Sequence, residues 1–379
     1  MPYPLRNPSQ TSRRGALRPP GARAASGPGP GVPPGEGVPA GEAGGVRMAN
    51  AKVVGALAAG TATRRARARW VRVRSGASAY GAEVVSTSSS PEDVPAPDVR
   101  PAGLSVVVIP GNPGTAEFYA EFVEGLQEQL GPGANVLAVG HRGHQAAGPE
   151  ADGREPFVLA DQIAHHEAFL RDRLRGDVAL VGHSIGAHIA LQCAKQLAAA
   201  GGGAGAAGEG PTVRKVVGLQ PYLQFDPRAG VQRRLDWVTW QGGPLSLLAY
   251  PLRAVPLAWR AALVKAVEGP RMGGEAAELV ARLAGDRGFV QNAFAMGQSE
   301  FRALRGGIDI DFIAGLAGEG RAAFVYSEAD HWAPLREAEA LRERGVPVTT
   351  VTDAEHGFVV DPAGTAAMVG HTAALLRGL

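Results

Sequence analysis

The feature that most limits the possible folds is an alternation of two kinds of segment between residues 104 and 222. Short apolar runs such as LSVVVI (104–109) and DVALVG (177–182) have the composition of strands buried on both faces. Between such runs lie longer segments with helical spacing, the first with apolar residues four apart from Phe118 to Leu130. This alternation predicts an α/β fold with a mostly parallel central sheet and helices on both faces.

Two departures from this alternation suggest how the domain is organised. Residues 69–87, RWVRVRSGASAYGAEVVST, predict an antiparallel hairpin at a sheet edge. From 222 to 318 the strand pattern stops and helical patterns take over, before strand-like segments return. A sheet interrupted by helices before its final strands is typical of a cap-domain architecture. We therefore expect a core formed by 70–221 and 319–379, with 222–318 as a helical cap insertion.

The first 69 residues differ in composition from the rest. They are rich in Pro, Gly and Arg and poor in large apolar residues, so they cannot repay the entropy of ordering. We expect a disordered extension, either as an Arg-rich organelle targeting segment or with a true start near Met48. A similar argument predicts a flexible Gly/Ala loop at 201–211. No apolar run has the length of a spanning helix or a secretory signal.

Charge and cysteine content narrow the function classes. The net charge is only +2, and the basic excess lies near the N-terminus, so the body of the protein is not expected to bind nucleic acid. The single cysteine, Cys193, excludes a disulfide framework and favours a reducing compartment. Cys193 is expected to pack on a helix, because no activating base is apparent beside it.

The segment GHSIG (182–186) carries the strongest chemical signal. It joins the apolar run DVALV to a helical segment, and a turn this sharp strains its middle residue unless neighbouring glycines remove clashing Cβ atoms. Gly182, His183 and Gly186 would thus form a nucleophile elbow that exposes Ser184, with the N–H of Ile185 facing a developing oxyanion. The alternative is an ordinary glycine-bounded turn with a serine helix cap.

A serine nucleophile needs a histidine base and a carboxylate, which follow it in the chain in this fold. His356 is the one late histidine in a loop after the last predicted strand, whereas His371 sits within the terminal helix. Asp330, at the end of the strand segment AAFVYSEAD, is preferred as the acid. Asp353 is the rival, but it would need a tight local turn to reach the same imidazole.

The loop PGNPG (110–114) is expected to supply a second oxyanion donor. It follows the strand that ends at Ile109, and the N–H of Asn112 is the candidate; a plain turn is the alternative. Metal and nucleotide cofactors are not indicated, because no HExxH, CxxC or Walker pattern occurs. Among the remaining histidines, His141 and His144 are expected to line a loop, and adjacent helical positions such as 165 and 166 point apart.

Five stretches together resemble the lipid-droplet-associated serine hydrolases of the α/β-hydrolase superfamily: VVVIPGNPGTAEFYAEF, QIAHHEAFL, VALVGHSIGAHIAL, SEADHWAP and EHGFVV. The similarity extends over about residues 70–379, and its most specific part is PGNPGxxxFY. The resemblance implies an α/β-hydrolase fold with Ser184 as nucleophile, Asp330 as acid and His356 as base. It also implies an ester-type lipid substrate and association with lipid droplets and the endoplasmic reticulum. The N-terminal extension and the 201–211 insert depart from the family pattern.

The segment 244–267, PLSLLAYPLRAVPLAWRAALVKAV, suggests how the protein would meet lipid. It is rich in Leu, Ala, Trp and Pro, and its charges are Arg253, Arg260 and Lys265. We expect it either to lie in a lipid monolayer with its basic residues at head-group level or to pack over the active-site pocket. The functional expectation is a lipid or sterol ester hydrolase. The alternatives are a thioesterase or small-ester hydrolase of cytosol or plastid, and a droplet-coating protein with little turnover.

Overall fold

The computed structural model describes residues 66–75, 78–87, 103–145, 156–201 and 210–379. Residues 1–65 of the expected disordered extension and most of the glycine-rich loop therefore lie outside the described residues. The expected boundary at 69 is wrong by a few residues, because strand β1 already begins at Arg67. All of the elements below belong to one compact unit that begins at Ala62.

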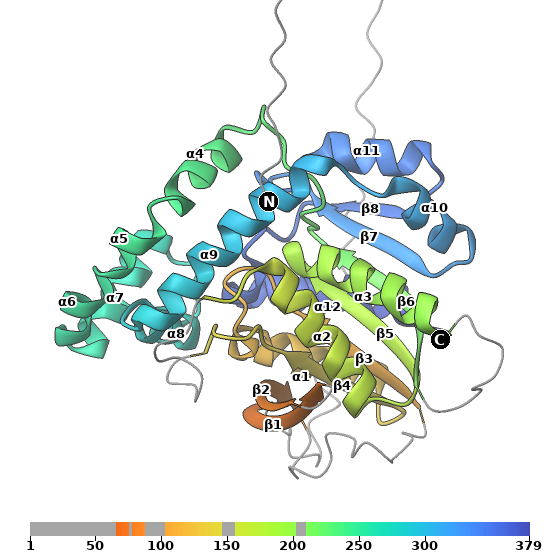
Figure 1. The fold of residues 1–379 in the computed structure, drawn as a ribbon, viewed down its shortest axis with the longest axis horizontal. Coiled ribbons are helices and arrows are strands. Elements are labelled where there is room, and N and C mark those ends of the chain that lie inside the picture. The colour runs from red at the N-terminus through yellow and green to blue at the C-terminus, as the bar shows by residue number, and fades with distance from the viewer. Residues whose placement is uncertain (1–65, 76–77, 88–102, 146–155, 202–209) are drawn as a thin grey trace, which may run out of the picture. The chain divides into compact units, whose positions relative to one another are not determined.

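An eight-stranded sheet forms the centre of this unit, with strand order β1-β2-β4-β3-β5-β6-β7-β8 (Figure 1). Strands β3 to β8 run parallel, and β1 and β2 form the antiparallel hairpin predicted for the sheet edge. The predicted mostly parallel sheet is thus confirmed. The strands are β1 (Arg67–Ser75), β2 (Ser78–Ser86), β3 (Leu104–Ile109), β4 (Ala134–Val139), β5 (Gly176–His183), β6 (Pro211–Leu219), β7 (Ala322–Ser327) and β8 (Val348–Val351).

Alternate residues of the central strands feed two separate apolar cores. In β3, Val107 and Ile109 join the core that contains Phe169, whereas Val106 and Val108 join the core of Phe122. Successive side chains of a strand point to opposite faces, so a strand buried on both sides is mostly apolar. This explains the run LSVVVI, in which the small Ser105 is the one polar residue and is also buried. Each large apolar side chain buried in this way contributes about 1.5–3 kcal/mol.

Helices cover both faces of the sheet. Helices α1 (Ala120–Leu130) and α12 (Pro362–Leu376) supply the core on one face, and α2 (Leu159–Arg173) and α3 (Ile185–Gly201) supply the other. Helix α11 (Leu335–Glu343) packs against β7 and β8. Short 3-10 turns precede α1, at Ala116–Tyr119, and α12, at Phe358–Val360.

Seven helices lie between β6 and β7, in the range expected for the insertion. Helix α9 contacts α4, α5, α6 and α8, and α10 packs instead against β7. Figure 1 shows α4 to α9 at one side of the sheet. Their bounds are α4 (Gly230–Thr239), α5 (Gly242–Ser246), α6 (Ala249–Ala254), α7 (Leu257–Glu268), α8 (Gly274–Ala284), α9 (Arg287–Ala303) and α10 (Ile310–Gly318).

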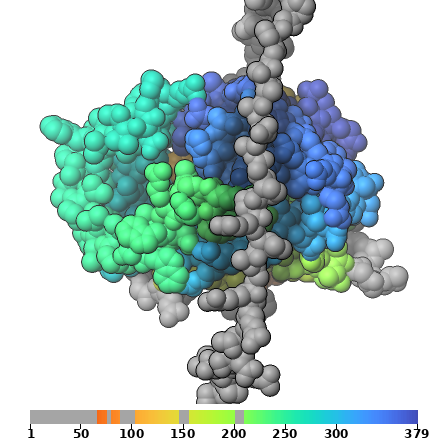
Figure 2. Space-filling view, turned by 90° about the horizontal axis from the view of Figure 1, so that it is seen from above, coloured from red at the N-terminus to blue at the C-terminus, as the bar shows by residue number. Residues whose placement is uncertain are grey.

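The surface of this helical insertion is unusually apolar. Helix α7 has no buried residue, and its Trp259, Leu263 and Val267 are 75%, 61% and 75% exposed. Figure 2 shows the part of the chain that holds α5 to α7, in green to teal, at the outside of the molecule. No helix in the described ranges combines the length and hydropathy needed to cross a bilayer.

Candidate active site

Ser184 occupies the turn between β5 and α3 in a strained backbone conformation. Its φ is 54°, in the left-handed region that residues with a Cβ rarely adopt. Three backbone hydrogen bonds hold it there: Ser184 N–H donates to the carbonyl of Leu219 (3.0 Å), and its own carbonyl accepts from Ala187 and Tyr222 (both 3.0 Å). Neighbouring strand and helix thus fix a conformation that local preferences disfavour.

The two glycines of GHSIG are required by close backbone approach. A Cβ built on Gly182 would lie 2.3 Å from the carbonyl oxygen of Gly186, and one on Gly186 would lie 2.2 Å from the carbonyl oxygen of Ile109. Both contacts are with backbone, which cannot swing away as a flexible side chain can. The G-x-S-x-G spacing therefore has a steric cause in this fold.

Ser184, His356 and Asp330 are brought together although they lie far apart in the sequence. The Nε2 atom of His356 lies 2.9 Å from Ser184 Oγ, and its Nδ1 lies 2.7 Å from Asp330 Oδ2. The other oxygen of Asp330 accepts from the backbone N–H groups of Trp332 (2.7 Å) and Ala333 (3.1 Å). With the carboxylate held in this way, the imidazole presents a basic nitrogen to the serine hydroxyl.

The alternative acid and histidine form a separate pair. Asp353 lies 3.3 Å from His371 Nε2 on the exposed side of α12, and neither residue lines the cavity at Ser184. His331 is exposed.

His183 ties the three loops of the site together, a role that sequence reasoning missed. Its Nε2–H donates to the carbonyl of His356 (2.8 Å), so its Nδ1 accepts from the Tyr119 hydroxyl (2.7 Å). That hydroxyl in turn accepts from the N–H of Gly111 (2.9 Å). Burial lowers the pKa of His183 to about 3 and keeps the ring neutral. The loop after β3, the serine turn and the His356 loop are thereby linked through one imidazole.

The loop at 110–114 packs directly against the serine. A Cβ on Gly111 would lie 3.2 Å from the Cβ of Ser184. The side-chain amide of Asn112 donates to the carbonyl of Ala293 and to Glu300 Oε1, both at 3.0 Å. Ile185 opens α3, whose first N–H groups have no acceptor within the helix. Asn112 thus lines the same cavity as Ser184, and Ile185 follows the serine directly in the chain; their role as oxyanion donors stays a prediction.

Four histidines form a buried cluster next to this loop, a grouping that the sequence analysis does not predict. His141 Nδ1 lies 2.9 Å from His166 Nε2, and the rings of His165 and His166 are 4.9 Å apart. His144 Nδ1 accepts from the N–H of Gly114 (2.9 Å). His165 and His166 are neighbours in α2, and both side chains are buried. The cluster therefore supports the loop rather than lining solvent.

The described part of the chain holds no group of three or more His, Cys, Asp or Glu side chains arranged to bind a metal ion. Cys193 packs on α3 as expected, fully buried, with its Sγ 3.8 Å from the carbonyl of Ile163. Burial raises the pKa of its thiol far above the ordinary value.

A cavity of about 300 Å³ opens beside the serine. Helices α4 and α9 supply much of its wall, so the segment 244–267 does not line it. The lining residues are Asn112, Pro113, Ser184, Tyr222, Leu235, Thr239, Ala293, Phe294, Gly297, Glu300, Phe301, Trp332 and His356.

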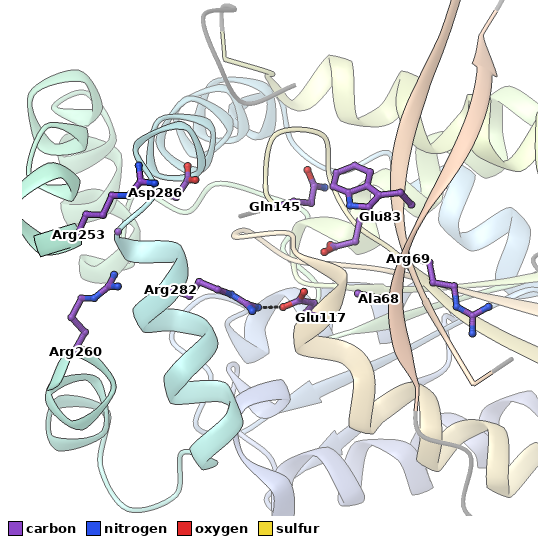
Figure 3. Close-up of a pocket in the computed structure, with 11 residues that line it drawn as sticks. Ala68, Arg69, Glu83, Glu117, Gln145, Arg253, Arg260, Arg282 and Asp286 are labelled. Atoms are coloured by element: carbon purple, nitrogen blue, oxygen red, sulfur yellow. Dashed lines mark hydrogen bonds and ion pairs between the residues drawn. The ribbon is translucent and has the colours of Figure 1, made fainter. Parts of the chain in front are cut away.

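A larger cavity of about 420 Å³ lies elsewhere, between the β1–β2 hairpin and the helical insertion. Figure 3 shows Arg253, Arg260 and Arg282 pointing into it from the insertion, with Arg282 paired to Glu117. It contains neither Ser184 nor His356. The larger volume of this cavity does not make it the candidate active site. The smaller cavity is the candidate, because Ser184 and His356 line it.

Solved structures share this fold. A membrane phospholipase A described as a bacterial virulence factor matches with a TM-score of 0.54 at 15% identity, covering 83% of this chain and 87% of that chain. An alpha/beta hydrolase fold protein from Burkholderia ambifaria matches with a TM-score of 0.50 at 14% identity, covering 81% and 99%. At these identities the likeness concerns the fold alone. With the sheet order and the turn at Ser184, it defines an α/β-hydrolase fold.

Sequence comparison narrows the class to one family. The lipid-droplet associated hydrolase family matches residues 102–359, more than half of the chain, and the chain belongs to this family. Lipid droplet-associated hydrolases from Drosophila melanogaster and Dictyostelium discoideum are similar to it. They are 43% identical over 98 residues (23% of this chain, 31% of the relative) and 35% identical over 102 residues (24% and 32%). The matched segment thus spans about a third of these relatives' length. The resemblance seen in the motifs is confirmed.

Proposed function

We propose that this protein is a serine hydrolase that cleaves carboxylic esters of lipids, sterol esters among them, through an acyl-enzyme on Ser184. The observation that carries this proposal is the unbroken pair of contacts from Ser184 Oγ through His356 to Asp330, at 2.9 and 2.7 Å. The family's name adds the lipid context. The mostly apolar and aromatic wall of the cavity suits an acyl chain better than a charged substrate.

In the proposed reaction, His356 Nε2 accepts the Ser184 proton as the serine oxygen attacks the ester carbonyl carbon. The Asp330 carboxylate stabilises the imidazolium, and the N–H groups of Ile185 and Asn112 hold the oxyanion. His356 then gives its proton to the departing alcohol. A water molecule, deprotonated by the same histidine, cleaves the acyl-enzyme and releases the acid.

The proposed location is a lipid-droplet or endoplasmic-reticulum surface, reached through the segment 244–267. The exposed stripe of Trp259, Leu263 and Val267, at spacings of four on α7, supports this because such a face gains free energy on entering a monolayer. Lys265 is the exposed head-group contact in this proposal. Arg253 points into the cavity of about 420 Å³, and Arg260 Nη1 donates to the carbonyl of Ala281 (2.6 Å), so neither is a head-group contact in this proposal.

The decisive experiment measures fatty acid release and fluorophosphonate labelling on the purified full chain. Ser184→Ala should lower turnover by about 10⁶-fold and abolish labelling, as loss of such nucleophiles does. Ser105→Ala is the matched control, because Ser105 is buried in β3 outside the cavity and its hydroxyl has no partner among the described residues. Full esterase activity or unchanged labelling in Ser184→Ala would reject the proposal.

A further inference from the structure

Three polar side chains in the cavity at Ser184 take no part in the proposed reaction steps. They belong to Asn112, Tyr222 and Glu300. A fourth polar lining residue, Thr239, differs from them because its hydroxyl already donates to the carbonyl of Asp236 (2.8 Å). The three have bonding capacity left over, which gives this part of the cavity a different chemistry from its apolar walls.

Asn112 presents a buried acceptor. Both hydrogens of its amide nitrogen are taken, by Ala293 and Glu300, and these two acceptors fix the amide orientation. A flipped amide would set its oxygen against the Ala293 carbonyl. The side-chain oxygen Oδ1 is buried and has no hydrogen-bond partner among the described residues.

Tyr222 presents a buried hydroxyl. The residue is 1% exposed, its ring contacts Phe301 and Trp332, and its hydroxyl likewise lacks a partner within the described part of the chain. Burial raises the pKa of this hydroxyl well above the ordinary value, so it stays protonated and can donate as well as accept.

Glu300 presents a neutral carboxyl group. It is 5% exposed, and burial raises its pKa to about 8, so the protonated form prevails at neutral pH. Oxygen Oε1 accepts a hydrogen bond from Asn112. The other oxygen, Oε2, can therefore carry the proton and donate it to a ligand. The hydrogen bond to Asn112 connects this group with the loop beside Ser184.

Unpaired polar groups in a buried hollow need a partner, since each costs about 1–3 kcal/mol when left unsatisfied. A partner that contacts all three must donate to Asn112 Oδ1 and accept from Tyr222 or Glu300. A hydroxyl group does both, whereas a carbonyl or ether oxygen cannot donate. A charged group would carry the far larger penalty of a buried ion.

We propose that Asn112, Tyr222 and Glu300 form a subsite for a hydroxyl group that the substrate carries near its ester bond. The preferred substrate class would then be hydroxylated esters, with the hydroxyl on the alcohol side, as in monoesters of polyols, or on the acyl side, as in hydroxyacyl esters. This inference rests on the proposed hydrolase function and specifies its substrate.

The test compares kcat/KM of the full chain for three esters of one chain length: 1-monooctanoylglycerol, methyl 3-hydroxyoctanoate and methyl octanoate. At least one hydroxylated ester should exceed methyl octanoate by about tenfold, the effect of one net hydrogen bond near 1.4 kcal/mol. Which ester it is identifies the side that carries the hydroxyl. Equal kcat/KM for all three would overturn the inference and leave the proposed function intact. Activity that survives Ser184→Ala would overturn both.

Variants assign the preference to the subsite. Tyr222→Phe removes a hydroxyl that has no hydrogen-bond partner among the described residues, so the fold should tolerate it, and the ratio of kcat/KM for the hydroxylated and the plain ester should fall toward one. Glu300→Leu should lower the ratio too, whereas Glu300→Gln should retain it because an amide still accepts from Asn112 and donates into the cavity. Glu83→Gln, at a buried carboxyl outside the cavity, is the control and should leave the ratio unchanged. If Tyr222→Phe and Glu300→Leu both leave the ratio of kcat/KM for the hydroxylated and plain esters unchanged, the assignment of the preference to this subsite is overturned.

Discussion

His183 and Tyr119 share a hydrogen bond of 2.7 Å directly below the turn that carries Ser184. Through it, the N–H of Gly111 on one loop is connected with the carbonyl of His356 on another. The residue that precedes the serine in the sequence therefore sets the relative positions of the loops on both sides of it.

Tyr119→Phe should weaken this connection. The buried Nδ1 of His183 would lose its donor, at a cost of about 1–3 kcal/mol in the free energy of unfolding. We expect kcat to fall more than KM rises, since the reacting groups shift while the cavity wall stays. Urea denaturation and steady-state kinetics of an ester substrate measure the two effects. A variant with unchanged stability and kcat would show that the connection has no role.

The two candidate acids can be separated by substitution. Asp330→Asn should lower kcat by about 10⁴-fold, the loss seen when the carboxylate that orients a triad histidine becomes an amide. Asp353→Asn removes only an exposed contact with His371 and should leave turnover within about twofold, since such surface pairs contribute about 0–1 kcal/mol. Equal losses in the two variants would contradict the geometry.

Gly186→Ala should prevent the serine turn from forming. Its Cβ would lie 2.2 Å from the carbonyl oxygen of Ile109, so β3 and α3 would have to separate. We expect the free energy of unfolding to fall by about 3 kcal/mol, as at other overpacked sites. Gly370→Ala is the control: it lies within α12 with open space around it and should gain up to about 1 kcal/mol. Thermal unfolding compares the two variants.

The pH dependence of stability follows from buried groups. Burial lowers the folded-state pKa of His144 and His183 to about 3 and of His165 and His188 to about 4. Below about pH 6.5 these histidines bind protons in the unfolded state but not in the folded state. Each histidine therefore lowers the free energy of unfolding by about 1.4 kcal/mol for every pH unit below 6.5, until its folded-state pKa is reached. Their contribution is complete above pH 6.5 and is lost as the pH falls toward 3–4.

Buried carboxyls act in the opposite direction. Burial raises the pKa of Glu83 to about 7 and of Glu300 and Glu337 to about 8, so their contribution is present below pH 4.5 and is lost as the pH rises through 7–8. Between pH 4.5 and 6.5 the four histidines raise the free energy of unfolding with pH more than the three carboxyls lower it. We therefore expect the free energy of unfolding, measured by urea titration, to be largest near about pH 6.5. Glu337→Gln should flatten the decline above that pH; stability that keeps rising to pH 9 would contradict the account.

The apolar stripe on α7 gives a prediction about lipid surfaces. Trp259→Asp combined with Leu263→Asp should lower partitioning onto phospholipid-coated triglyceride droplets at least about tenfold, since each side chain contributes more than about 1 kcal/mol when buried. Leu379→Asp removes an exposed leucine at the opposite end of the described unit and should not affect partitioning (Figure 1). Unchanged binding of the double variant would exclude α7 as the contact.

Short-range patterns made the sheet predictable. The run at 104–109 matches β3 to the residue, because a glycine precedes this mostly apolar strand and a proline follows it. The sequence analysis does not predict the helix at 335–343, which forms α11. Its many charges leave Ala338 and Leu341 as the buried apolar residues, with Leu335 partly buried against the same core.

The proximity of Ser184, Asp330 and His356 could be predicted because each residue follows the end of a strand, where the fold brings loops together. The link through Tyr119 and the clustering of His141 with His166 could not. Both depend on which faces of separate elements meet, and spacing along the chain carries no such information. The hydroxyl of Tyr222 was missed for the same reason.

The attachment of Asn112 to α9 has a mechanical consequence. The Asn112 amide donates hydrogen bonds to Ala293 and Glu300 on α9, and Asn112 itself belongs to the loop that lies against Ser184. These two bonds therefore connect the helical insertion with the candidate active site. A tilt of α9, caused by a bulky occupant of the cavity or by a force on the helices that contact it, would therefore pull on Asn112 and on the loop beside Ser184. In the proposed enzyme, the helix that shapes the substrate cavity would then also adjust the position of that loop.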